Sequence, residues 1–99
     1  MLSVDEIKDA VKDVAEDYGV EKVVLFGSYA RGEATASSDV DLRIEKGKLR
    51  GLFQLSGFQI NLKERLNTNV DVLTTESLDK NFLRNIHHDE VVLYERKKT

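Results

Sequence analysis

Two aspartates separated by one residue, Asp39 and Asp41, are the first candidates for chemistry in this sequence. In an extended strand, residues i and i+2 point to the same side, so the two carboxylates would stand about 6.6 Å apart at the backbone. At that distance two full charges repel by about 2.5 kcal/mol at an effective dielectric constant of roughly 20. A divalent cation that prefers oxygen ligands, Mg²⁺ or Mn²⁺, would replace this repulsion with coordination. The alternative is an exposed strand with two solvated carboxylates, and the pair alone does not decide between the two.

A third aspartate, Asp71, lies in the middle of another apolar run. Its side chain faces away from those of Val70 and Val72, because side chains alternate along a strand. If the two strands share an apolar face, Asp71 joins Asp39 and Asp41 on the polar face. Three carboxylates on neighbouring strands are what a phosphoryl-transfer site with two metal ions requires.

A glycine–serine pair, Gly27 and Ser28, follows the short apolar run of residues 23–26. A glycine just after a buried strand lets the backbone approach a ligand closely. The Ser28 hydroxyl and the backbone N–H groups that follow it, at the start of a short helix, can bind an anion, and Arg31 can add a guanidinium for phosphate oxygens. By itself such a pair is more often only a turn, but here it leads directly to the carboxylates. Tyr29 could either stack on a base or pack at the start of its helix.

The elements that must position these residues follow from the periodicity of apolar residues. Ser3 and Glu6 form a capping box for a first helix, which ends at Gly19. The expected elements, in chain order, are a helix from Ser3 to Tyr18, strands at residues 23–26 and 40–44, a helix from Lys48 to Leu66, a strand at 70–73, a helix from Leu78 to His87 and a strand at 91–94. This order predicts the α/β or α+β class, with helices packed on a sheet.

Apolar side chains on helical stripes are expected to face the core. Leu52 falls on or near the apolar stripe of the second long helix, although two glycines lower the expected continuity of that helix. Phe53, Phe58 and Phe82 are likewise expected in the core.

Three charged or ionisable residues have structural interpretations. Arg43 shares the polar face of its strand with the aspartates, where it would either balance their charge or, less readily, touch a substrate. His87 and His88 stand at the end of a helix, where a cation complements the helix dipole, and their spacing does not fit a metal site.

Length and composition exclude several classes of protein. A chain of 99 residues is expected to form one domain, residues 1–99. Cysteine is absent, and a net charge of −3 argues against general nucleic-acid binding. No long apolar run predicts a membrane span or a secretory signal, so a cytoplasmic location is expected by default. The basic residues Lys46, Lys48 and Arg50 are either solvated surface or contact phosphates or an acidic partner.

The run from Val24 to Gly32, followed by Ser38 to Leu42, resembles the minimal nucleotidyltransferases of the DNA polymerase β superfamily. The Gly-Ser pair, the gap of ten residues and the Asp-x-Asp pair match without an insertion. The resemblance implies the nucleotidyltransferase fold, a mixed sheet of about four strands with helices packed on it. It also implies site roles: Asp39 and Asp41 would bind two divalent metal ions, Asp71 would be a metal ligand or general base, and Gly27, Ser28 and, by its position, Arg31 would hold the phosphates.

The sequence also resembles the stand-alone antitoxin subunits of HEPN–MNT toxin–antitoxin pairs. That resemblance implies transfer of AMP from ATP to a tyrosine of a HEPN-type toxin. After the site and the core, little of the chain remains to hold a large acceptor, so another protein is expected to present it. A module that neutralises its partner only by binding, or a sensor that binds ATP without transfer, are the alternatives.

Overall fold

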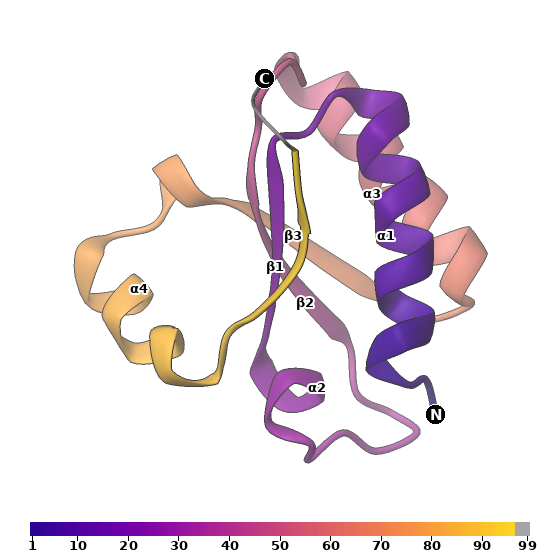
Figure 1. Cartoon of the computed structure of the whole chain (residues 1–99), viewed down its shortest axis with the longest axis vertical. Coiled ribbons are helices and arrows are strands. Elements are labelled where there is room, and N and C mark those ends of the chain that lie inside the picture. Colours follow the sequence, from indigo (N-terminus) through magenta and orange to yellow (C-terminus); the bar gives the residue numbers. More distant parts are fainter. Residues whose placement is uncertain (97–99) are drawn as a thin grey trace.

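A computed structural model describes residues 1–96 and shows a four-stranded mixed sheet with helices on both sides (Figure 1). The strands are β1 (Lys22–Phe26), β2 (Val40–Glu45), β3 (Val70–Thr74) and β4 (Val91–Glu95). Their order in the sheet is β3-β2-β1-β4. β1 pairs antiparallel with both β2 and β4, whereas β2 and β3 run parallel. The predicted fold class, strand number and interior position of β1 are confirmed.

The first helix, α1 (Val4–Tyr18), begins and ends as predicted. Ser3 accepts a hydrogen bond from the backbone N–H of Glu6, and the Glu6 carboxylate accepts one from the N–H of Ser3. Gly19 ends the helix in the left-handed conformation that glycine adopts without strain. These two signals lie within a few residues of the ends, which is why the sequence alone could place both.

The second long helix, α3 (Gly51–Leu66), is continuous but starts three residues later than predicted. Leu49 is buried just before it, so the residues ahead of Gly51 contribute to the core without being helical. Phe58 is fully buried, as predicted. The core assignment is wrong for Phe53, which is 96% exposed, and Leu52, placed on or near the apolar stripe, is 80% exposed, since the side of the helix that packs on the core carries Phe58, Leu62 and Leu66 instead.

The segment between β3 and β4 contains a shorter helix than the one predicted from Leu78 to His87, with a 3₁₀ turn on each side of it. It consists of the 3₁₀ turn η1 (Thr75–Ser77), helix α4 (Lys80–Ile86) and the 3₁₀ turn η2 (His87–Asp89). Asp79 sets the start of α4 by accepting a hydrogen bond of 2.7 Å from the backbone N–H of Phe82. Phe82 is 36% exposed rather than buried in the core, and its ring meets the edge of the Phe26 ring.

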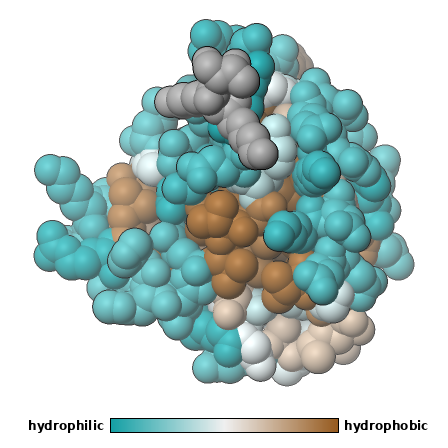
Figure 2. Space-filling view, viewed as in Figure 1, coloured by the Kyte–Doolittle hydropathy of each residue, from teal (hydrophilic) through white to brown (hydrophobic). Residues whose placement is uncertain are grey.

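The core lies on one face of the sheet, under α1 and α3. Figure 1 shows α4 on the opposite side of the strands. Figure 2, in the same orientation, shows apolar atoms gathered near β4 and toward α1, within a largely hydrophilic surface. In the part of the chain that the structure describes, no helix has the length and apolar character needed to cross a membrane.

Candidate active site

Asp41 and Asp71 face each other across the parallel pair of strands β2 and β3. The register places Asp41 directly beside Asp71. Their neighbours Val40, Leu42 and Val70 point to the opposite face and are buried in the core. The alternation of apolar and acidic residues in both strands therefore produces the shared polar face that the sequence predicts.

Gly27 lies against Asp41 from the other side. Phe26, the last residue of β1, is the antiparallel partner of Asp41, and the backbone turns at Gly27 with a positive φ of 77°. A Cβ atom at Gly27 would collide with the Asp41 carboxylate oxygen and lie 3.1 Å from its Cγ. Glycine is thus required here twice, by the backbone conformation and by the space that the carboxylate fills.

The carboxyl group of Asp41 is electrostatically unfavourable where it stands. Burial raises its pKa above the ordinary value of 3.8, and the charges of Asp71 and then Asp39 raise the pKa further. The charge of Arg31 lowers the pKa, while a hydrogen bond with the Asp71 side chain raises it again. A carboxylate with this balance would be stabilised by a cation beside it, and carboxylate oxygens are the ligands that hard divalent ions prefer.

Asp39 is less constrained than the other two aspartates. It precedes the first residue of β2 and is exposed. Within residues 1–96, no group of three His, Cys, Asp or Glu side chains is arranged so that it could hold a metal ion. The structure therefore pairs Asp41 with Asp71 and leaves Asp39 outside a compact ligand set, because no strand register fixes its position.

The predicted short helix after Gly27 is present as α2 (Gly27–Arg31). Ser28 is partly exposed in its first turn, next to the glycine that touches Asp41. Tyr29 is buried in the hydrophobic core, which settles its alternative interpretations in favour of packing. Arg31, at the end of α2, contacts Glu33 at 3.3 Å and is partly exposed. It is also the cation that acts on Asp41.

Arg43 does not balance the charge of the aspartates, so the prediction for this residue is wrong. Its side chain is buried and donates from Nε to Glu90 at 2.7 Å and from Nη1 to the Thr75 hydroxyl at 2.9 Å. A longer ion pair of 3.9 Å joins it to Glu45. Thr75 and Glu90 stand at the two ends of the segment that carries α4. One guanidinium thus connects both ends of this segment to β2, two residues from Asp41.

Glu90 is held ionised by these contacts. Burial by itself would raise its pKa, but the hydrogen bond and the charge of Arg43 act in the opposite sense and the pKa is lowered overall. His87, whose Nδ1 lies 3.4 Å from Glu90, adds a smaller lowering contribution. His87 therefore contacts an acid at the end of the α4 segment, which supports the structural interpretation of this residue.

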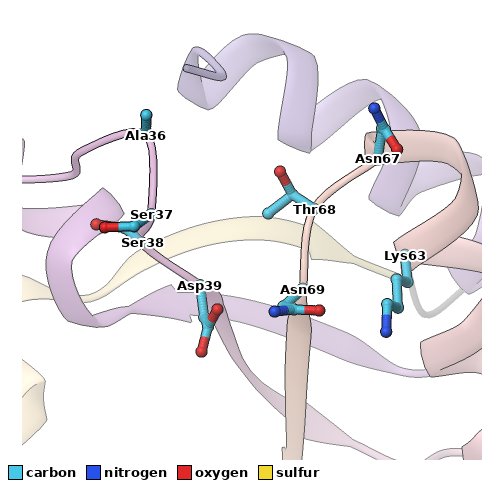
Figure 3. A pocket seen from close by; sticks show the side chains of 8 residues that line it. All are labelled: Ala36, Ser37, Ser38, Asp39, Lys63, Asn67, Thr68 and Asn69. Carbon is cyan, nitrogen blue, oxygen red and sulfur yellow. The ribbon is translucent and has the colours of Figure 1, made fainter.

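A polar depression of about 520 Å³ opens beside Asp39. Figure 3 shows Asp39 on one side, Lys63 on the other and Asn69 between them. The lining residues come from the loop before β2, the end of α3 and the turn into β3: Ala36, Ser37, Ser38, Asp39, Lys63, Asn67, Thr68 and Asn69. The sequence predicted residues 67–69 only as a turn, since nothing local shows that they lie next to Asp39.

Comparisons of the sequence match the chain to a known family and to curated relatives. The model of the polymerase beta nucleotidyltransferase family matches residues 9–99. MntA of Thermococcus cleftensis, named a protein adenylyltransferase, is 30% identical over 95 residues, which cover 92% of this chain and 96% of MntA. MJ0435 of Methanocaldococcus jannaschii is 36% identical over 77 residues, which cover 78% of this chain and 83% of the relative.

Solved structures show the same fold. A toxin–antitoxin structure with AMP-PNP aligns with a TM-score of 0.75 at 18% identity, over 97% of this chain and 76% of the other. A complex of a tri-AMPylated HEPN toxin with an MNT antitoxin from Shewanella oneidensis aligns with a TM-score of 0.71 at 15% identity, over 94% of this chain and 73% of the other. At these identities the two structures establish the shared fold.

Proposed function

The chain belongs to the polymerase beta nucleotidyltransferase family, and from that premise we propose that it transfers AMP from ATP to a hydroxyl group of a HEPN-type toxin. By this modification it acts as an antitoxin. The acceptor that we propose is a tyrosine of the toxin. The observation that carries the proposal is the register of Asp41 with Asp71, directly beside the glycine that begins α2.

We propose that the carboxylates bind metal ions. Asp41 and Asp71, joined by Asp39, would hold Mg²⁺ or Mn²⁺, with two ions expected as in other phosphoryl-transfer sites. When bound, the ions neutralise charge on the triphosphate. The raised pKa of Asp41 supports this assignment, because an acidic side chain surrounded by like charges favours a bound cation.

Gly27, Ser28 and Arg31 are proposed to hold the triphosphate. The absence of a side chain at Gly27 brings the α2 backbone next to Asp41, and Ser28 adds a hydroxyl donor in the same turn. Arg31 already acts electrostatically on Asp41, so its guanidinium is near enough to share a phosphate with that site. Its pairing with Glu33 is partly solvent-exposed and therefore weak, which leaves the guanidinium available.

The acceptor is proposed to enter beside β3. Asp71 is the outermost of the paired carboxylates in the sheet and is exposed. It can accept the proton of the acceptor hydroxyl as the oxygen attacks the α-phosphorus of ATP. The bond from that phosphorus to the bridging oxygen then breaks, and pyrophosphate leaves. The polar depression, which Asp39 helps to line, is proposed to receive part of the acceptor.

Incubating the chain with ATP, Mg²⁺ and the product of its neighbouring gene, and then weighing that partner, tests the proposal. We expect the mass of one or more AMP groups on the partner with the wild-type chain and none with Asp39→Asn/Asp41→Asn. Asp13→Asn, which removes a surface carboxylate paired with Arg65, is the matched control and should transfer AMP normally. An undiminished adduct with the double variant would contradict the proposal.

A transfer-deficient chain that still blocks toxicity in cells would favour the binding-module alternative. The same Asp39→Asn/Asp41→Asn variant serves for this comparison, because its substitutions preserve side-chain size. Tight ATP binding measured by calorimetry, without any adduct on the partner, would instead favour a sensor.

A further inference from the structure

The α4 segment, residues 75–90, lies on the same side of the sheet as the candidate active site. It joins β3 to β4, which are the two edges of the sheet, so it crosses from one edge to the other. Figure 1 shows α4 on the side of the strands opposite to α1 and α3. That is the side to which Asp41 points, because its strand neighbours Val40 and Leu42 are buried in the core.

The α4 segment borders the site where α2 begins. The Phe82 ring meets the edge of the Phe26 ring, with centroids 6.0 Å apart. Phe26 is the strand partner of Asp41 and directly precedes Gly27, whose missing side chain leaves room for the Asp41 carboxylate. Farther along the segment, η2 comes close to α2. A nucleotide held by Gly27 and α2 therefore has the α4 segment as a neighbour.

Few apolar contacts hold the α4 segment in this position. The structure describes every residue of the segment, and none of them belongs to the hydrophobic core cluster on the other face. No side chain of α4 itself is buried, and Phe82 is 36% exposed. Segments with little apolar burial open locally at a low cost in free energy. The position of the α4 segment therefore depends mainly on its polar contacts.

Arg43 supplies polar contacts to both ends of the segment. Its Nε donates to Glu90 at 2.7 Å, and its Nη1 donates to the Thr75 hydroxyl at 2.9 Å. The side chains of Arg43 and Glu90 are each only 10% exposed. Arg43 points to the same side of β2 as Asp41, two residues away. The segment is thus fastened to the strand that carries the candidate metal ligand.

This contact fixes a position as well as contributing stability. An apolar pair of similar volume is often about as stable as a buried ion pair, but apolar contacts are not directional. The guanidinium is planar and rigid, so its two hydrogen bonds hold both acceptors at set angles. A lysine ammonium keeps the charge without this fork. Stability and position can therefore be separated by substitution.

We propose that Arg43 is a positioning residue of the nucleotide site, because it holds the α4 segment where that segment lines one side of the bound ATP. The inference rests on the proposed function for the identity of the nucleotide. Without the fastening, only a fraction of the molecules has the segment in place, and the apparent affinity for ATP falls by that fraction. Bound ATP restores the arrangement, so the rate at saturating ATP is retained.

Arg43→Lys and Thr75→Val test the proposal. The first keeps the charge but loses the fork, and the second keeps the shape of the side chain but loses the acceptor. We expect the KM for ATP to rise about tenfold in Arg43→Lys and about threefold in Thr75→Val, with kcat within about twofold of the wild type. Calorimetric titration with ATP and Mg²⁺ should show the same loss of affinity. Circular dichroism verifies the fold, and Thr75→Val decides if Arg43→Lys does not fold.

Arg43→Met/Glu90→Leu separates position from stability. The apolar pair should recover much of the stability that Arg43→Met loses, yet the KM for ATP should stay raised about tenfold, because the directional contacts are still missing. Hydrogen exchange within residues 75–90 should be faster than in the wild type, with α1 and α3 still protected. A KM that returns to the wild-type value together with stability would overturn the proposal.

Glu76→Gln is the matched control. It removes an acid of the same segment that pairs with Lys46, but this ion pair is solvent-exposed and contributes little. Its KM for ATP should be unchanged. An unchanged KM in Arg43→Lys and Thr75→Val, an equal rise in Glu76→Gln, or a loss confined to kcat would overturn the proposal. If the wild-type chain binds ATP but transfers no AMP, the proposed function fails, and the calorimetric affinities still decide whether Arg43 positions the nucleotide site.

Discussion

The two faces of the sheet are built for different purposes. On one face, α1 and α3 cover the strands, and side chains such as Leu25, Leu42 and Ile44 are fully buried among apolar neighbours. On the other face lie Asp41 and Arg43, and Figure 1 shows the segment that carries α4 on this side of the strands. In α4 itself, whose residues are all described, no side chain is buried. Apolar burial on the first face stabilises the fold, and the second face holds charge.

The charged face itself contains two contrasting sites. At one, Arg43 is surrounded by Glu90, Thr75 and Glu45, so a buried charge is fully partnered. At the other, Asp41 stands beside two more aspartates, and burial and repulsion raise its pKa. A charge with partners stabilises the fold, whereas burial and like charges at Asp41 cost stability, as is common at active sites.

The largest expected effect is that of Asp41→Asn. We expect transfer of AMP to fall about 1,000-fold, or about 4 kcal/mol in transition-state stabilisation, because a metal ligand is lost. In metal-free buffer at neutral pH the variant should be more stable than the wild type by about 1 kcal/mol, because the repulsion is removed. Mass spectrometry of the partner and chemical denaturation measure the two quantities.

The sign of the stability change follows from the raised pKa. The penalty from ionised Asp41 is present above its folded pKa and disappears as the pH falls through that value toward and below 3.8. The advantage of Asp41→Asn should therefore shrink in acid. A variant that is less stable than the wild type at neutral pH without metal would show that Asp41 has a structural role.

Arg43→Met tests the partnered site. It leaves the carboxylate of Glu90 buried without its main partner, and we expect a loss of about 3 kcal/mol in the free energy of unfolding. Adding Glu90→Leu should restore much of it, since an apolar pair can replace a buried ion pair. Arg65→Met breaks an exposed ion pair with Asp13 and should cost less than about 1 kcal/mol. Equal losses in the two single variants would mean that Arg43 is no more than a surface charge.

The candidate site was predictable because its signals are local. Asp39 and Asp41 are two residues apart, and strand alternation predicts that Asp71 shares their polar face if the two strands share an apolar face. The register that brings Asp71 beside Asp41 confirms the prediction for these two residues, whereas Asp39 precedes β2 and has no strand partner. The position of Gly27 was also predictable from local sequence, because a glycine directly after a short apolar run indicates a turn at the end of a buried strand.

What the sequence could not show depends on distant contacts. Glu90 is 47 residues from Arg43, and no pattern near either residue indicates that they meet. Phe53 and Phe58 have the same type and lie on the same helix, yet one is exposed and the other buried. Only the placement of α3 on the sheet distinguishes them. The polar depression beside Asp39 could not be predicted either, because its walls come from three separate parts of the chain.

Acid should affect the two charged sites in opposite directions. The pKa of Glu90 is lowered from 4.5, so its contribution to stability is present above that value and is lost as the pH falls through the lower, folded pKa. Glu90→Gln should therefore flatten the acid side of the stability curve, while Asp41→Asn should steepen it, since the relief that the wild type gains in acid is gone. Denaturation between about pH 3 and 7 measures both slopes. Parallel slopes in the two variants would contradict the contrast between the sites.

The smallest expected effect on the free energy of unfolding is that of Phe82→Ala, because few side chains of the α4 segment are packed against the sheet. Phe82 meets the ring of Phe26 edge to face, with centroids 6.0 Å apart, and is partly exposed. Phe82→Ala should therefore cost about 1 kcal/mol, the value of one such ring contact, whereas Phe58→Ala on the opposite face should cost about 3–5 kcal/mol. Hydrogen exchange should increase within residues 75–90 in Phe82→Ala and leave α1 and α3 protected, because the core does not depend on this contact. A global loss of protection in that variant would show that the two faces fold as one unit and that the α4 segment is as essential to stability as the helix-covered core.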